Sequence, residues 1–76
     1  MTDRAAPKRD PRREPKKGDR LSFPGGIMSI KRTVESVEGS VVTYSYMDGR
    51  YRGRSTTNLE TWILKAADAK VLHAAD

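Results

Sequence analysis

The residues of this sequence whose type and spacing could bind a partner are the basic ones. Arg50, Arg52 and Arg54 recur at every second position, and side chains two residues apart share one face of a β-strand. Such a row could contact the phosphates of a nucleic acid. It could equally form a solvated face whose charges discourage pairing with another chain. Tyr51 lies between two of these arginines in the sequence and could give a partner an aromatic contact.

A second group of basic residues lies in residues 1–17. This segment has three prolines and no apolar residue larger than alanine after Met1. It cannot bury enough apolar surface to offset the entropy lost on folding. We therefore predict a disordered arm over residues 1–17 and a domain over residues 18–76. The arm is either a solubilising tail or a contact for nucleic acid or an acidic partner. Its candidate binding residues are Arg9, Arg12, Arg13, Lys16 and Lys17.

Groups that could support catalysis or bind a metal do not form a recognisable set. The chain has no cysteine, and its only histidine, His73, is close to the end. Gly25 and Gly26 are not followed by the lysine of a phosphate-binding loop. Glu35 and Glu38 flank a turn, where we expect solvated carboxylates. We predict a protein that is not an enzyme, with no cofactor, no metal and no small-molecule substrate.

A chain of 76 residues is long enough for only one small domain. Its net charge is +5. Residues 1–20 carry eight lysines and arginines against four acids, so most of the excess charge is near the N-terminus. No apolar run approaches the roughly 20 residues of a membrane span. The N-terminus also lacks a hydrophobic signal region. With cysteine absent as well, we expect a cytoplasmic protein that does not enter a membrane.

The pattern of residues 20–56 predicts four strands. Arg20 to Phe23 alternates polar and apolar and then meets Pro24. Residues 27–37 form a longer strand, in which Arg32 interrupts the apolar face and a change of phase indicates a bulge near Glu35-Ser36. Residues 40–47 are rich in β-branched and aromatic side chains. Residues 50–56 return as the fourth strand.

A two-residue turn at Asp48-Gly49 would set the pairing of the last two strands. It places Met47 opposite Arg50 and Tyr44 opposite Gly53, so that a tyrosine ring could lie across the glycine. The predicted core face holds Val42, Tyr44, Tyr46 and Tyr51. The predicted polar face holds Thr43, Ser45, Met47, Arg50, Arg52 and Arg54.

A short helix should follow. Thr57 and Glu60 fit a capping box, with Thr57 as the N-cap. The apolar residues Leu59, Trp62, Ile63 and Ala66 have helical spacing. We expect this helix to end near residues 67–68, before a closing strand over residues 70–72.

This order of elements resembles small SH3-like proteins of bacteria, phages and plasmids. The resemblance rests on Gly18-Asp19-Arg20-Leu21, the Gly39 turn before residues 41–44, the Asp48-Gly49 turn and the segment from Ser55 to Trp62. It implies a mainly β fold: a five-stranded SH3-like barrel with one short helix before the last strand. The plasmid-borne dihydrofolate reductases are similar in size and in the start of the barrel. Residues 54–57 lack their Val-Gln-Ile-Tyr active-site run.

These features predict a non-enzymatic binding module. The first hypothesis is a protein-interaction module, an inhibitor or adaptor of phage or mobile-element type. The alternative is a nucleic-acid-binding accessory protein that uses the basic arm and the arginine-bearing strand. A homodimer could form through an apolar patch of Phe23, Ile27 and Met28.

Overall fold

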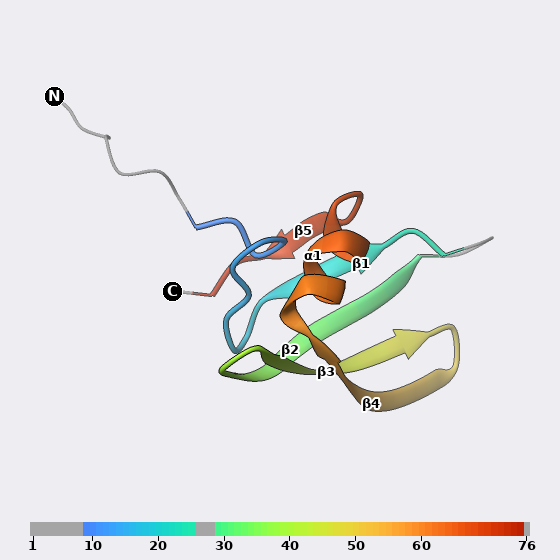
Figure 1. Cartoon of the computed structure of the whole chain (residues 1–76). Coiled ribbons are helices and arrows are strands. Elements are labelled where there is room, and N and C mark those ends of the chain that lie inside the picture. Colours follow the sequence, from blue (N-terminus) through green and yellow to red (C-terminus); the bar gives the residue numbers. More distant parts are fainter. Residues whose placement is uncertain (1–8, 26–28, 76) are drawn as a thin grey trace, which may run out of the picture.

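The structure is a computed structural model that describes residues 9–25 and 29–75. Its fold is mainly β, as the sequence predicts. Five antiparallel strands form one sheet in the order β4-β3-β2-β1-β5, and a helix lies across one side of it (Figure 1). The elements are β1 (Arg20–Phe23), β2 (Ile30–Glu38), β3 (Val41–Asp48), β4 (Tyr51–Asn58), α1 (Leu59–Ala66) and β5 (Lys70–His73). The sheet is not closed within these residues, since β4 and β5 are its two edges.

Both tight hairpins are built on a glycine in the same position. Glu38 pairs with Val41 and Asp48 pairs with Tyr51, so the two loops are Gly39-Ser40 and Gly49-Arg50. Each glycine has a φ of +61°. The first central residue of a type I′ or II′ turn needs a positive φ, which glycine adopts without a steric penalty.

The register of β3 and β4 therefore differs from the predicted one. Met47 faces Arg52 and Tyr46 faces Gly53, each two residues beyond the expected partner. A shift of two residues keeps the side chains of the paired residues on their predicted sides of the sheet, because side chains alternate with a period of two. Arg50, predicted to lie on the polar face, is instead part of the turn. A ring does lie across Gly53, but it is that of Tyr46: a Cβ added to Gly53 would lie 2.4 Å from the Tyr46 hydroxyl oxygen.

The predicted core face is correct for β3 and wrong for Tyr51. Val42 and Tyr44 are buried, whereas Tyr51 is 78% exposed at the start of the edge strand. The core lies between the sheet and α1. It is formed by Leu21, Phe23, Val34, Val42, Tyr44, Trp62, Ala66 and Ala69.

The predicted bulge in β2 is present, between Val34 and Ser36. The helix begins one residue later than predicted. Asn58, not Thr57, is its N-cap, and the Asn58 side chain accepts a hydrogen bond of 2.8 Å from the Thr61 amide. Thr57 is instead the cross-strand partner of Val42. The helix is too short to cross a membrane, and it is the only helix in the described ranges.

Residues 9–17 pack against the domain, which differs from the expectation of a disordered arm. The Trp62 indole donates a hydrogen bond of 3.1 Å to the carbonyl of Pro11, which is itself buried. Arg9 pairs with the buried carboxylate of Asp19 at 2.6 Å. These two contacts tie the segment to the domain with polar groups, since it has almost no apolar side chains. The rest of the predicted arm, residues 1–8, lies outside the described residues.

Candidate functional site

The side of the sheet opposite α1 carries two rows of side chains that cross the strands. One row runs Arg20, Thr33, Ser45 and Arg54, which are directly paired across β1, β2, β3 and β4. The second row runs Lys70, Ser22, Lys31, Met47 and Arg52, from β5 to β4. We call this surface the open face. Strands lie about 4.8 Å apart, so the rows span roughly 14 and 19 Å.

The five basic residues of the open face are exposed. They are Arg20, Lys31, Arg52, Arg54 and Lys70. None of them forms a salt bridge within residues 9–25 and 29–75. The two rows contain no acidic residue. Glu35 in the bulge and Glu38 at the turn lie towards the other end of β2. The central part of the open face is therefore positively charged, with its cations available to a partner.

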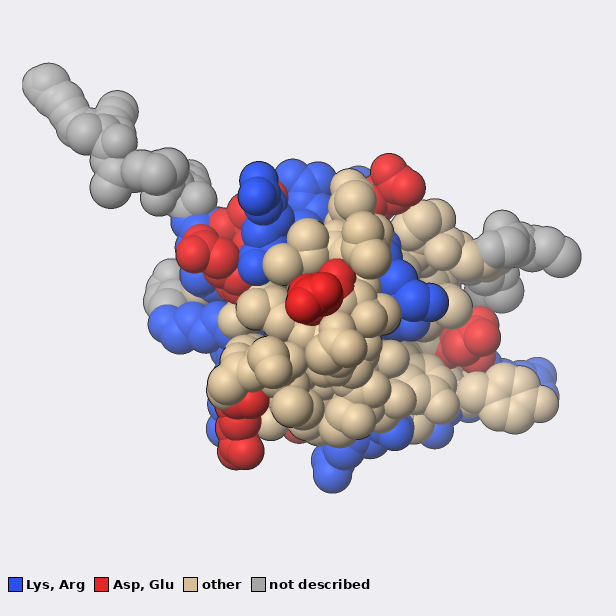
Figure 2. All heavy atoms as spheres, viewed as in Figure 1, with Lys and Arg blue, Asp and Glu red and all other residues tan. Residues whose placement is uncertain are grey.

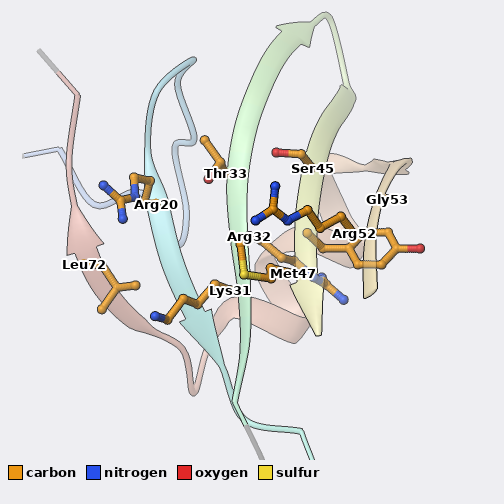
Figure 3. A pocket seen from close by; sticks show the side chains of 10 residues that line it. Arg20, Lys31, Arg32, Thr33, Ser45, Met47, Arg52, Gly53 and Leu72 are labelled. Atoms are coloured by element: carbon orange, nitrogen blue, oxygen red, sulfur yellow. The ribbon is translucent and has the colours of Figure 1, made fainter. Parts of the chain in front are cut away.

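A shallow hollow of about 290 Å³ lies in the middle of this surface. Figure 3 shows its lining, with Arg20 and Lys31 on one side and Arg52 reaching from β4 towards β2. Thr33, Ser45 and Met47 lie between these cations. The arrangement provides flexible positive charges around a small floor of mixed polar and apolar atoms. Tyr46 also lines the hollow, but it belongs to the core side of β3, so neither row has an aromatic side chain on which a nucleobase could stack.

The opposite side of the molecule has a different character. Figure 2, viewed from the side of α1, shows a mostly uncharged middle, with both basic and acidic residues around its rim. Leu64 is 77% exposed on this side of the fold. The five basic residues of the open face share one side of the sheet because side chains alternate along its strands.

Arg9 and Arg12, two of the predicted basic residues of the N-terminal segment, pair with acidic side chains. Arg9 donates to both carboxylate oxygens of Asp19, at 2.6 and 2.8 Å. Arg12 donates to Asp10 at 3.1 Å. Arg13, Lys16 and Lys17 are exposed. The backbone amide of Lys16 donates to Asp19.

The electrostatics of Asp19 show how firmly this segment is held. Burial by itself raises the pKa of Asp19, but hydrogen bonds from Arg9 and from the amides of Ala75 and Lys16 outweigh it, so the pKa lies below its usual value. The hydrogen bonds from Arg12 likewise hold the pKa of Asp10 below its usual value. Arg9 therefore contributes to the fold through the buried Asp19. Arg12 makes only a local, partly exposed pair with Asp10.

Of the predicted strand residues, Arg52 and Arg54 lie on the open face. Arg50 occupies a turn. Tyr51, at the start of β4, is on the core side of the sheet but is exposed. The sequence reasoning missed Arg20, Lys31 and Lys70. Alternation was the available signal. Arg20 directly precedes Leu21, and Lys31 directly precedes Arg32, and both of these followers occupy core-side positions. Because neighbouring side chains of a strand point to opposite faces, Arg20 and Lys31 must point away from the core.

Other sequence predictions have a plain structural outcome. Phe23 is 4% exposed and does not contribute to a surface patch, while Ile27 and Met28 lie outside the described residues. Within the ranges 9–25 and 29–75, no three histidine, cysteine or acidic residues gather as metal ligands would.

Comparison with known proteins adds no relative. No family model, curated protein or solved structure matches this chain. The arguments about function therefore depend on the chemistry of the open face.

Proposed function

We propose that this chain is a non-enzymatic module that binds the phosphate backbone of nucleic acid with its open face. The observation that carries the proposal is the concentration of exposed cations on one side of the sheet, with no acid in either row. The SH3-like architecture expected from the sequence is part of the proposal. The strand order supports this architecture, because β1 to β4 are neighbours in sequence order and β5 pairs with β1.

The chemistry of the face favours backbone contacts over base recognition. Lysine and arginine bind phosphates through charge, which is independent of sequence. Modules that bind single strands add aromatic side chains on which bases stack. Neither row has one, so we expect a duplex to bind at least as tightly as a single strand. The rows also exceed the ~12 Å width of the duplex major groove. Their ends could therefore reach phosphates on both of its walls.

A salt titration tests the proposal directly. Binding of a labelled 20-base-pair duplex would be followed by fluorescence polarisation between 25 and 300 mM NaCl. Each neutralised phosphate contributes about −0.9 to the slope of log K against log[salt], so five contacts predict a slope of roughly −4.5. Arg52→Gln should lower the steepness by about one unit. Lys31→Gln should do the same.

Lys65→Gln is the matched control, because it removes one positive charge from the exposed surface of α1. It should leave the slope unchanged. If Lys65→Gln lowered the steepness of the salt slope as much as Arg52→Gln does, only the net charge would matter. That result would reject the open face as the binding surface. Absence of binding at 25 mM NaCl would reject nucleic acid as the ligand. A protein partner, the first hypothesis from the sequence, should instead remain bound after nuclease treatment.

A further inference from the structure

Arg32 is the one arginine of β2 that points to the core side. Its guanidinium carbon lies 4.4 Å from the centre of the Phe23 ring and 4.6 Å from that of Tyr44. Both rings in turn contact Trp62, with centroids 5.3 and 5.7 Å apart. The guanidinium is therefore held between rings that are themselves packed in the core. It is much less free to move than a surface arginine.

No acceptor within the described ranges meets this guanidinium. The Arg32 Nε is buried without a hydrogen-bond partner. Arg32 also forms no salt bridge there, unlike Arg9 and Arg12. Leaving a buried donor unpaired is costly. An apolar side chain would fill the same space without that cost. Cation–π contact with the two rings offsets part of that cost. It gives the Nη groups no acceptor within residues 9–25 and 29–75, so these groups remain available to a ligand.

Arg32 also lines a second hollow, on the opposite side of the sheet from the open face. This hollow measures about 330 Å³, at the small end of ligand pockets. Ile30, Tyr44 and Tyr46 give it apolar and aromatic atoms, although most of its exposed lining is polar. Asp48, Ser55 and Arg54 complete its lining. Arg54 lies on the edge strand β4, so it belongs both to the open face and to this hollow.

We propose that this hollow binds a carboxylate carried on an apolar or aromatic group. The planar fork of a guanidinium can donate two parallel hydrogen bonds to a carboxylate. The Nη groups of Arg32 are the ones that face a ligand, since its Nε is covered. Charges of Arg32, Arg54 and Asp48 leave the site with one net positive charge, which a monoanion balances. A phosphate monoester would bring close to two negative charges towards Asp48.

Benzoate is the probe for this site. Its binding to the full chain would be measured by calorimetry and by the NMR shift of the Arg32 side-chain N–H. A ligand of this size should bind with a Kd on the order of 1 mM. Benzamide, which has the same shape and no charge, should bind at least tenfold more weakly. Phenyl phosphate should also bind more weakly, and tighter binding than benzoate would overturn the choice of a carboxylate.

Variants separate this site from the open face. Arg32→Lys keeps the charge and removes the fork, so it should weaken benzoate binding about tenfold. Arg52→Gln, on the open face, should change it less than twofold. Exposed Asp48 gives a second variant that does not threaten the core: Asp48→Asn should tighten binding two- to threefold. Unchanged benzoate affinity in both Arg32→Lys and Asp48→Asn would overturn the proposal.

The source of the carboxylate is resolved by a peptide pair. Gly-Gly-Phe with a free C-terminus would be compared with the same peptide amidated. If the free peptide binds at least as tightly as benzoate and the amide does not, the site takes a protein C-terminus. If only benzoate binds, it takes a small aromatic acid. Binding of neither would reject the site, and the nucleic-acid titration would stand independently of that result.

Discussion

Replacing Asp19 with asparagine should strongly destabilise the fold. The Asp19 carboxylate is fully buried and accepts four hydrogen bonds, from both Nη groups of Arg9 and from the amides of Lys16 and Ala75, at 2.6 to 2.8 Å. Asparagine keeps the shape, removes the charge and directs an NH₂ group at donors. Breaking a buried ion pair costs about 3–5 kcal/mol. Arg9 is a quarter exposed and can regain water, so we expect about 3 kcal/mol.

A loss of this size should lower the Tm by roughly 12–24 °C, since 1 kcal/mol corresponds to about 4–8 °C in a domain of this length. The effect should depend on pH with a definite sign. The pKa of Asp19 is lowered in the folded protein. Its contribution is therefore complete above the pKa of an ordinary carboxyl, about 4. It is lost as the pH falls through the lower folded value. The Tm difference between wild type and Asp19→Asn should shrink below pH 4.

The measurement is thermal unfolding by circular dichroism between pH 2 and 7. Asp68→Asn is the control, because it removes one negative charge from an exposed position next to the helix, and it should change the Tm by no more than a few degrees. A fall of less than about 4 °C in Asp19→Asn at pH 7 would refute the reasoning. So would a Tm difference that stays constant down to pH 2.

Three further substitutions test other contacts. Trp62→Phe removes the donor to the Pro11 carbonyl and should cost about 1 kcal/mol or more, seen as a lower Tm. Gly53→Ala puts a Cβ 2.4 Å from the Tyr46 hydroxyl oxygen and should cost about 1–3 kcal/mol in urea unfolding; the same loss in a Tyr46→Ala background would contradict this clash. Asn58→Ala removes the helix cap and should cost about 1 kcal/mol, whereas Thr57→Ala, at the predicted cap, should cost less.

The strands could be predicted from the sequence because β-branched residues, alternation and glycine turns all indicate the same elements. The exact pairing could not. Asp48-Gly49 is a strong turn signal, but the sequence does not say whether glycine is the first or the second central residue. The structure places Gly49 first. The predicted faces nevertheless hold, because the error is two residues and the side-chain period is also two.

The N-terminal segment could not be predicted because its stability depends on long-range polar contacts. Composition correctly shows that residues 9–17 have almost no apolar surface to bury. It cannot show that Asp19 and Ala75 come together to receive Arg9. Nor can it show that the Trp62 indole needs an acceptor, which Pro11 supplies. Such contacts join residues more than 50 positions apart, and no local pattern records them.

The positions of the cations on the open face distinguish binding from protection against aggregation. Charges that block pairing with another chain are needed on edge strands. This reason suffices for Arg52 and Arg54 on β4 and for Lys70 on β5, which are the edges of the sheet. It does not account for Arg20 on β1 or Lys31 on β2, since both strands have neighbours on each side. Like charges brought together on one surface repel each other, which destabilises the fold slightly. An anionic partner that spans the sheet would remove this repulsion, and edge protection would not.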